Sequence, residues 1–571
     1  MNATPESAAA VPARASRRTA AIAALLIAVV WLGALGLRGL FSPDEGRYAE
    51  IPREMLASGD WVTPRMNGLK YFEKPPLQYW ATAAAYALFG ENEWSARLWP
   101  ALAGLAAALA AAWSAARVFS PRAGLVAGVV LASSWAYVLA GQYLTLDMSL
   151  TGLLGVALAL FVAAQHDGAD ARLRRRAMLC AWACVALALL TKGLVALVLP
   201  GFAVVAYVVV QRDPRLLLRL HLGGGLLVML ALTLPWFALV QSRNPEFFQF
   251  FFIEEHFRRF TVPGHNRPGP WWYFIPVGVL GMLPWTVAAL VAMGRAAKPG
   301  AAPSAPDARA KPFHPERFLL AWALAIFVFF SISRSKLPAY VLPAFPALAM
   351  LAGLELARGG RRVQYACAAS MLLVGVALLA LLPQLQGWRK FGAVASELDA
   401  ADNWLWAAAG VVAAGGAAMA WAARAGRSGA VLAGAAASSL MAWLLAFGFM
   451  HRVADGYSAQ RLVQDRMGVG AAQRPFAPEV PFYSVGVFDH GMPFYLGRTL
   501  TMVEYMGELA PGIAAEPSKF VPSIAEFERL WRDLPRGYAV MRPELQRTLA
   551  ARGVAMKEVA RDARLVVVSR P

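Results

Sequence analysis

A stretch of charged and polar residues, 41–80, lies between two apolar segments and holds the side chains best suited to chemistry. Its acids and cations include Asp44, Glu45, Arg47, Glu50, Arg53, Glu54, Arg65, Lys70, Glu73 and Lys74. A chain that is 58% hydrophobic seldom concentrates so many ionisable groups in one loop unless that loop faces water and acts on a polar ligand.

The acidic pair Asp44-Glu45 directly follows the first apolar run. Such a pair can orient a sugar, bind a metal, act as a base, or start the next helix. The helix alternative has Ser42 as N-cap and Pro43 as first helical residue, with the acids in the first turn. Both alternatives stay open for Glu45, whereas the charged neighbours of Asp44 favour a chemical role for it.

Two further positions combine a charge with a membrane boundary. Lys74 precedes Pro75-Pro76 in FEKPP, and a compact lysine charge suits a phosphate, although a lysine there can also extend toward lipid headgroups. Asp147 lies near one end of an apolar run, where a carboxylate is costly unless it is paired or faces a cavity. The alternative for Asp147 is a helix cap displaced by a few residues.

The loop 242–270 adds an aromatic patch, FFQFFF, and the charged segment EEHFRRF. Its clustered arginines, among them Arg259, match phosphate recognition. His256 with a glutamate could hold zinc, but two ligands are few for a metal, and a hydrogen-bonded interfacial histidine is the favoured alternative. Lys336 and Tyr340 in SRSKLPAYVLP either bind substrate or anchor the chain at the interface.

The elements that position these residues are apolar helices. Mean hydropathy is +0.48, which is too high for a soluble protein of 571 residues. Runs of about 20 apolar residues match a hydrocarbon core of roughly 30 Å and predict about thirteen spans. The runs lie near 19–37, 96–116, 123–140, 145–164, 177–190, 194–211, 221–241, 271–293, 316–332, 337–356, 363–383, 404–423 and 428–450. Segment 79–90 is too short to span and predicts a re-entrant or interfacial helix.

Lys and Arg occur in every second loop, which predicts a cytoplasmic N-terminus. These clusters lie before the first span and at 117–122, 172–176, 212–219, 295–317, 358–362 and 424–427. The acid-bearing loops would then face outward, and the net charge of +19 reflects topology rather than nucleic-acid binding. The first run is too long for a cleaved signal peptide. Cys180, Cys184 and Cys367 fall within spans, so the sequence predicts no disulfide framework.

The composition changes after residue 450. Short runs rich in β-branched and aromatic residues, such as VPFYSVGVF and ARLVVVSRP, predict strands, and IAEFERLWRDL and PELQRTLAARG predict helices. We therefore expect a transmembrane catalytic domain over 1–450 and an outward-facing α/β domain over 451–571, with a flexible cytoplasmic linker near 301–312.

Five motifs of the chain carry a family resemblance: SPDEGRYAEIPREML, GDWVTPRMNGLKYFEKPPLQYW, EEHFRRF, PWWYF and SKLPAYVLP. Together they resemble the aminoarabinose transferases, which are bacterial members of the protein-mannosyltransferase-like GT-C glycosyltransferases. The resemblance is dense from residue 20 to about 350. It implies about thirteen transmembrane helices, juxtamembrane helices in the first outward loop, and a periplasmic C-terminal domain.

The resemblance also implies a reaction and its residues. The family transfers 4-amino-4-deoxy-L-arabinose from undecaprenyl phosphate to a lipid A phosphate in the inner membrane, which reduces binding of cationic peptides such as polymyxin. Asp44 and Asp147 would be the catalytic carboxylates. Lys74, Arg47 and Arg259 would hold the donor phosphate, with Lys336 and Tyr340 as further substrate-binding residues. The family pattern has an arginine ahead of the glutamate in EEHFRRF, so no role carries over to Glu254.

No cofactor is expected to be required, and Glu73 with His256 is the place where a zinc ion would bind. The expected partners are the lipid-linked donor, lipid A and membrane lipids, with no nucleic acid, and the chain is expected to be a monomer. Two alternatives remain: a related GT-C transferase with another polyprenyl-phosphate sugar or a protein acceptor, and a polyprenyl-phosphate transporter or flippase. A flippase would show a polar path across the bilayer, whereas the acids here lie near the ends of the apolar runs.

Overall fold

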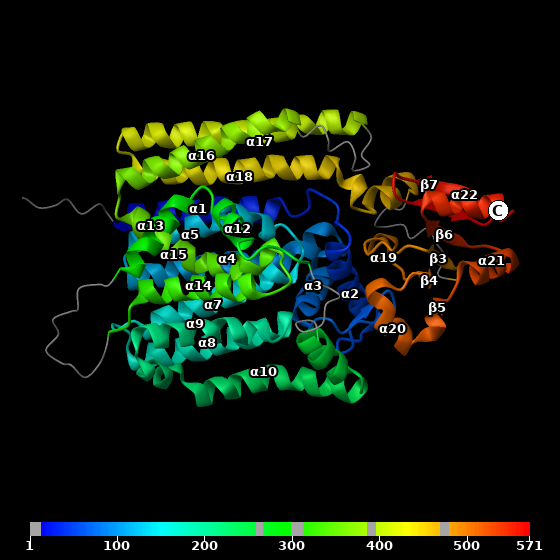
Figure 1. Cartoon of the computed structure of the whole chain (residues 1–571), viewed down its shortest axis with the longest axis horizontal. Helices are drawn as coiled ribbons and strands as arrows, with labels where there is room; N and C mark the ends of the chain where they lie inside the picture. The colour runs from blue at the N-terminus through cyan, green and yellow to red at the C-terminus, as the bar shows by residue number, and fades with distance from the viewer. Residues whose placement is uncertain (1–12, 259–266, 299–311, 385–394, 469–478) are drawn as a thin grey trace, which may run out of the picture.

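Long apolar helices form one block, and a small α/β domain lies at one end of it (Figure 1). The computed structural model describes residues 13–258, 267–298, 312–384, 395–468 and 479–571. The helices of the block are α1 (Ala13–Gly33), α4 (Glu93–Val118), α5 (Pro121–Ser133), α6 (Trp135–Gly141), α7 (Leu146–Gln165), α8 (Ala171–Lys192), α9 (Val195–Gln211), α10 (Leu222–Arg243), α12 (Phe274–Gly281), α13 (Thr286–Ala297), α14 (Pro315–Ile332), α15 (Phe345–Ala357), α16 (Arg361–Leu381), α17 (Ala395–Arg424) and α18 (Ser428–Arg452).

The block is that of an integral membrane protein. Within the described ranges, eight helices are long and apolar enough to cross a membrane, and up to ten spans result if two bent helix pairs each count as one. The bends are 63° between α5 and α6 and 115° between α12 and α13. The polytopic helical fold is confirmed, and the count of about thirteen spans stays a prediction.

Small residues allow close packing around α7, the helix that carries Asp147. A Cβ atom on Gly152 would lie 2.5 Å from the carbonyl oxygen of Ala103 in α4, so only glycine fits there. Such close backbone contacts are a common means of helix association in membranes. These contacts fix the position of α7, and therefore of Asp147, relative to the other helices of the block.

Two shorter helices lie between the block and the α/β domain. Helix α2 (Asp44–Ser58) ends at Gly59, whose φ of 71° is left-handed, and α3 (Leu77–Phe89) packs against α2 and α4. Helix α3 is the short, non-spanning helix expected near 79–90. The predicted N-cap at Ser42 is wrong: α2 begins one residue later, at Asp44, with Pro43 as N-cap and no side-chain cap.

A tight hairpin joins α2 to α3. Strands β1 (Arg65–Met66) and β2 (Leu69–Lys70) pair antiparallel through Asn67 and Gly68, which both have positive φ. Asn-Gly is the pair favoured for this kind of two-residue turn. The turn contacts the α/β domain, because the Asn67 amide exchanges hydrogen bonds of 2.8 and 2.7 Å with the backbone of Leu500.

The α/β domain is built on a six-stranded mixed sheet of order β5-β4-β3-β6-β8-β7. Strands β3, β4, β5 and β6 run parallel, and β8 pairs antiparallel with both β6 and β7. The elements are β3 (Phe482–Val485), α19 (Met492–Leu496), β4 (Thr501–Val503), α20 (Ala510–Ala515), β5 (Phe520–Val521), α21 (Ile524–Asp533), β6 (Tyr538–Met541), α22 (Pro543–Ala551), β7 (Lys557–Arg561) and β8 (Val566–Ser569). The predicted strands and both predicted helices are present, whereas the division of the chain at residue 450 stays a prediction.

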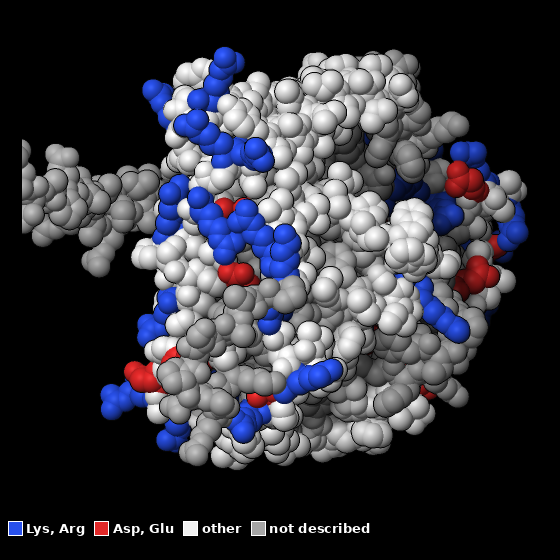
Figure 2. Space-filling model, turned by 60° about the vertical axis from the view of Figure 1, so that its left-hand side comes forward, with Lys and Arg blue, Asp and Glu red and all other residues white. Residues whose placement is uncertain are grey.

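Charge is distributed unevenly along the long axis. Figure 2 shows Lys and Arg gathered at the end of the helix block away from the α/β domain, then a broad band without charged side chains. The α/β domain at the other end carries both signs of charge. An uncharged band with cations concentrated on one side is the pattern expected for a protein that crosses a membrane in one orientation.

Candidate active site

The base of the site is a buried ionic cluster around Glu45, which is fully buried. Its carboxylate pairs with Arg38 and, at 2.8 Å, with Arg97 of α4. It also accepts hydrogen bonds from the backbone N–H groups of Phe41 at 3.0 Å and Leu144 at 2.9 Å. Burial alone would raise the pKa of Glu45, but the two arginines outweigh it and lower the pKa to about 2. Glu45 therefore ties the start of α2 to α4 and to the segment that leads into α7.

Asp44, the neighbour of Glu45, has a side chain that is 44% exposed. Its carboxylate lies 3.5 Å from Nη1 of Arg47, one helical turn further along α2. Nη2 of Arg47 lies 2.5 Å from Glu508 of the α/β domain, and the guanidinium faces the rings of Tyr48 and Tyr71 at 5.7 and 5.9 Å. Arg47 is thus a buried cation that links the exposed Asp44 to the α/β domain.

Asp147 lies in the first turn of α7 and forms an ion pair with Lys192, the last residue of α8. The Lys192 ammonium also lies 4.9 Å from the centre of the Tyr340 ring, which attracts a cation. The structure thus brings together two expected site residues, Asp147 and Tyr340. The sequence interpretation missed Lys192, although a lysine between the closely spaced apolar runs 177–190 and 194–211 was a signal of a functional position.

Tyr48 of α2 is a buried tyrosine whose pKa responds to several of the expected site charges. Its hydroxyl is buried, and burial is the main reason why the pKa of Tyr48 is raised. Arg47 acts in the opposite direction, while Asp44, Glu73 and Asp147 raise the pKa further. Four of the expected site residues, two from α2, one from the chain after β2 and one from α7, therefore act electrostatically on one phenol.

Two lysines that were expected to bind substrate have local hydrogen bonds. The Lys74 ammonium donates to the carbonyl oxygen of Glu73 at 2.8 Å. Lys336 is 5% exposed and donates to the carbonyl oxygens of Phe330, Ser331 and Ser333 at the end of α14. Those three bonds give Lys336 a helix-capping role, and its expected role in substrate binding stays a prediction.

The expected contribution of the loop 242–270 can be followed only in part. Arg259 and the side chain of His256 lie outside the described residues, whereas the backbone of His256 belongs to a π-helix, η2 (Gln249–Arg258). In the part of the chain that is described, no group of three His, Cys, Asp or Glu side chains could hold a metal ion. The zinc site at Glu73 and His256 therefore stays a prediction.

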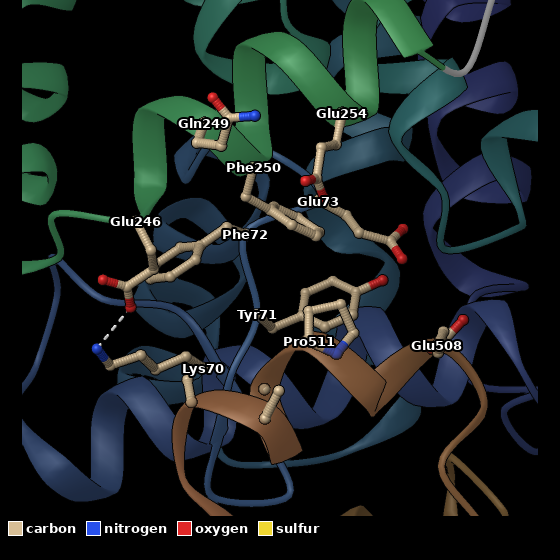
Figure 3. Close-up of a pocket in the computed structure, with 13 residues that line it drawn as sticks. Lys70, Tyr71, Phe72, Glu73, Glu246, Gln249, Phe250, Glu254, Glu508 and Pro511 are labelled. Carbon is tan, nitrogen blue, oxygen red and sulfur yellow. Dashed lines mark hydrogen bonds and ion pairs between the residues drawn. The ribbon is translucent and has the colours of Figure 1, made fainter. Parts of the chain in front are cut away.

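A pocket of about 360 Å³ opens beside these residues, between the β2 segment, η2 and the α/β domain (Figure 3). We call it the acidic pocket because four glutamates line it. Its polar and aromatic lining comprises Lys70, Tyr71, Phe72, Glu73, Glu246, Gln249, Phe250, Glu254 and Glu508. In Figure 3, Glu254 descends from η2, Glu73 and Tyr71 come from the chain after β2, and Glu508 lies below them on the α/β domain.

Glu508 is the main site residue that sequence reasoning missed. Its carboxylate accepts from Arg47 and lies 2.8 Å from Nε2 of His490. Burial acts to raise its pKa, but the hydrogen bond with His490 and the charge of Arg47 prevail, so the pKa of Glu508 is lowered. Nothing in the local string GELAPG marks this residue, because its partner Arg47 lies 461 positions away.

A second cavity of about 580 Å³ is lined by Glu508 together with His490. Ser42 and Pro43 border it from the membrane side, and Arg542 and Arg564 from the α/β domain. Since Glu508 lines both cavities, one carboxylate forms part of the wall between them.

A block of membrane helices with a charged pocket at one end, formed by the first inter-helix loop and covered by a small α/β domain, defines a membrane glycosyltransferase of the GT-C class. Family models agree with this assignment. Residues 17–251 match the model of dolichyl-phosphate-mannose-protein mannosyltransferases, and residues 469–570 match the aminoarabinose transferase C-terminal domain.

A solved structure covers nearly the whole chain. The chain is similar to the crystal structure of ArnT from Cupriavidus metallidurans bound to undecaprenyl phosphate, with 39% identity, 98% of both chains covered and a TM-score of 0.86. The chain belongs to the aminoarabinose transferase family of GT-C glycosyltransferases.

Curated relatives match over a shorter length. A transferase from Edwardsiella ictaluri named undecaprenyl phosphate-alpha-4-amino-4-deoxy-L-arabinose arabinosyl transferase is 34% identical over 57% of both chains. A protein of the same name from Pseudomonas aeruginosa strain LESB58 is 37% identical over 64% of this chain and 65% of the relative. In these alignments the chain spans between about half and two thirds of the relatives' length.

Proposed function

We propose that the chain transfers 4-amino-4-deoxy-L-arabinose from undecaprenyl phosphate to a phosphate of lipid A at the periplasmic face of the bacterial inner membrane. The observation that carries the proposal is the likeness, over nearly the whole chain, to a transferase crystallised with undecaprenyl phosphate. The ion pairs of Arg47 with Asp44 and Glu508, and of Asp147 with Lys192, support a reaction at this place. The modification would add positive charge to lipid A and so weaken binding of polymyxin.

The reaction is a substitution at the anomeric carbon of the sugar. An oxygen of the acceptor phosphate forms the new bond, and the bond from the anomeric carbon to the donor phosphate oxygen breaks. The leaving undecaprenyl phosphate takes the bonding electrons, so negative charge grows on it. The acceptor is already ionised, and a strong general base is therefore not required.

The residues of the site match this charge development. Arg47 and Lys74, together with Arg259, would hold the leaving phosphate, and fixed cations beside a growing charge are often the largest catalytic contribution. The exposed Asp44 would orient the acceptor or stabilise positive character at the anomeric carbon. The ion pair of Asp147 with Lys192 would position the sugar. Zinc, if bound at Glu73 and His256, would supply further positive charge for a phosphate.

A comparison of Asp44→Asn with the wild type tests the proposal. In single-turnover transfer from defined undecaprenyl-phosphate donors to lipid A, we expect the variant to be slower by at least about 100-fold. Donor affinity should change far less, because only interactions that strengthen in the transition state speed the step. Asp402→Asn, at an exposed aspartate of α17, is the matched control and should retain wild-type transfer.

One outcome would contradict the role of Asp44, and two would contradict the proposed function itself. Wild-type transfer by Asp44→Asn would leave this aspartate a helix-starting residue. Purified wild-type protein that binds the donor but never releases its sugar would instead indicate a transporter. Transfer of another sugar, or transfer to a protein, would place the chain among related GT-C enzymes.

A further inference from the structure

Helix α2 contacts the backbone of the α/β domain at Gly46, the residue before Arg47. A Cβ atom on Gly46 would lie 2.4 Å from the backbone nitrogen of Gly491 and 2.6 Å from the carbonyl carbon of His490. Only glycine fits at such a close approach of two backbones. The side chain of Arg47 therefore leaves α2 directly beside the loop of the α/β domain that carries His490.

Glu508 of the α/β domain lies on a turn that is fixed on both sides. The preceding Gly507 has a φ of 46°, a left-handed conformation that favours glycine. The following Leu509 is 1% exposed and belongs to a hydrophobic core that also contains residues of α2 and β2. A Cβ atom on Gly512 would lie 2.6 Å from the carbonyl oxygen of Lys70, so α20 contacts the backbone of β2. The turn is thus held in place against the first loop.

The two oxygens of the Glu508 carboxylate have different partners. Oε2 accepts a hydrogen bond from Nη2 of Arg47 at 2.5 Å, and Oε1 lies 2.8 Å from Nε2 of His490. The His490 side chain is 8% exposed, and its ring packs edge-on against the ring of Phe488 at 5.0 Å. A carboxylate held from both sides has one orientation, so His490 orients Glu508, and Glu508 orients the guanidinium of Arg47.

Other contacts also attach the α/β domain to the first loop. Arg65 pairs with Glu516 at 2.9 Å, and the Asn67 side chain donates to the backbone of Leu500 at 2.8 Å. A buried ion pair is a weak source of net stability, because both charges lose their hydration. Attachment of the domain therefore does not by itself account for an ion pair at Arg47, the residue expected to hold the donor phosphate.

Arg47 retains one nitrogen for a ligand. Nη2 donates to Glu508, and Nη1 lies 3.5 Å from the carboxylate of Asp44. Nε is buried and has no hydrogen-bond partner among the residues that the structure describes. A buried N–H group without an acceptor is costly, so a bound molecule is expected to provide one.

We propose that the α/β domain completes the donor-phosphate site: Glu508, itself oriented by His490, positions the guanidinium of Arg47 for the phosphate of the lipid-linked donor. Glu508 and His490 are positioning residues, since they act through Arg47 and not on the substrate. A cation that is already held in place stabilises the charge growing on the leaving phosphate without reorganisation. The inference rests on the proposed function and adds to it the part that the α/β domain plays in the reaction.

The test determines whether Glu508 acts through Arg47. In full-length protein, kcat/KM for aminoarabinose transfer and the affinity for undecaprenyl phosphate are both measured. Glu508→Gln keeps the size of the side chain and an acceptor oxygen but removes the charge, so it should lower kcat/KM by about tenfold and weaken binding of undecaprenyl phosphate. In an Arg47→Met background the same substitution should change either quantity by less than about twofold, because the residue through which it acts is gone.

Two control positions separate the positioning of Arg47 from attachment of the domain. Glu516→Gln removes the charge that pairs with Arg65 at the same interface, and it should leave kcat/KM within about twofold of the wild type. His490→Leu removes a partner of Glu508 and should lower kcat/KM by about threefold to tenfold. His490→Gln, whose amide can donate in place of the imidazole, should restore most of that loss.

Three results would overturn the inference. The first is wild-type kcat/KM and wild-type affinity for undecaprenyl phosphate in Glu508→Gln. The second is a loss in Glu508→Gln that persists in full in the Arg47→Met background. The third is an equal loss in Glu508→Gln and Glu516→Gln, which would mean that attachment of the domain is what matters. Absence of any aminoarabinose transfer by the wild type would instead contradict the proposed function, and the affinities for undecaprenyl phosphate would still decide whether Glu508 acts through Arg47.

Discussion

Lys192 and Lys336 both lie at the C-terminal ends of apolar helices, yet their ammonium groups have different partners. Lys336 donates to three backbone carbonyls at the end of α14 and holds that end together. Lys192 instead pairs with the carboxylate of Asp147 from another helix and lies near the ring of Tyr340. Only Lys192 therefore connects expected site residues.

The ion pair of Asp147 and Lys192 predicts non-additive substitutions. Both side chains are largely buried, 15% and 17% exposed, so removal of one partner leaves the other uncompensated. We expect Asp147→Asn and Lys192→Met each to lower the thermal midpoint in detergent. The double variant should be more stable than the sum of the two predicts, by about 1 kcal/mol.

Transfer activity, measured in the same variants, separates an effect of the ion pair on stability from an effect on catalysis. The double variant should regain stability but remain at least about tenfold slower in sugar transfer than the wild type. A double variant with wild-type turnover would show that the pair only stabilises the helices.

At the scale of elements, α2 is held in place by buried charges rather than by an apolar face alone. Glu45, Glu50, Arg53 and Glu54 are all buried in this helix. Oε2 of Glu54 accepts a hydrogen bond from the backbone N–H of Gly68 at 2.8 Å. Burial and the neighbouring Glu50 raise the pKa of Glu54 to about 8, against the lowering effect of Arg53. Glu54 is thus protonated at neutral pH.

This raised pKa predicts how stability depends on pH. Between the unfolded pKa of 4.5 and the folded pKa of about 8, the folded state binds the proton and the unfolded state does not. The contribution of Glu54 to the free energy of unfolding therefore falls as pH rises through this window. Glu54→Gln keeps an acceptor for Gly68 and cannot ionise, so its thermal midpoint should decline less from pH 5 to pH 9 than that of the wild type. Parallel midpoint curves for the two proteins would show that Glu54 is already ionised at neutral pH in the fold.

At the scale of the whole molecule, the site is a junction between two distant parts of the chain. Side chains of α2 and of the β1–β2 hairpin contact the α/β domain through Arg47 to Glu508, Asn67 to Leu500 and Arg65 to Glu516. Ser42 adds a hydrogen bond of 2.7 Å to Asp489. These contacts require that the first loop and the α/β domain lie on the same side of the membrane.

That requirement predicts a labelling pattern. Single cysteines replace exposed alanines at Ala57, Ala551 and Ala171, in a background without the three native cysteines. In intact spheroplasts, an impermeant thiol reagent should modify the first two, since they would face the periplasm, and should reach Ala171→Cys only after permeabilisation. Protection of the first two together with labelling of the third would contradict the orientation and the proposed reaction.

The sequence allowed prediction of what depends on local pattern. Apolar runs predicted the helical block, runs rich in β-branched and aromatic residues predicted the strands, and the charges of the loop 41–80 indicated Asp44 and Arg47 as candidate site residues. Glu508 and the Asp489 partner of Ser42 could not be found in this way, because they meet the first loop only through the tertiary fold. Local pattern also missed that Lys336, one turn beyond α14, donates to backbone carbonyls at the end of that helix.

The separation between Arg47 and Glu508 also sets an order of events during synthesis. They are 461 residues apart, and at about 5–20 residues per second the ribosome makes them roughly 20–90 s apart. The cluster around Glu45 needs only residues between Arg38 and Leu144, so it can assemble long before the α/β domain exists. The start of α2 can therefore be held at the membrane by the Glu45 cluster before the partner of Arg47 has been made, and the contact of Arg47 with Glu508 closes only when the α/β domain is complete.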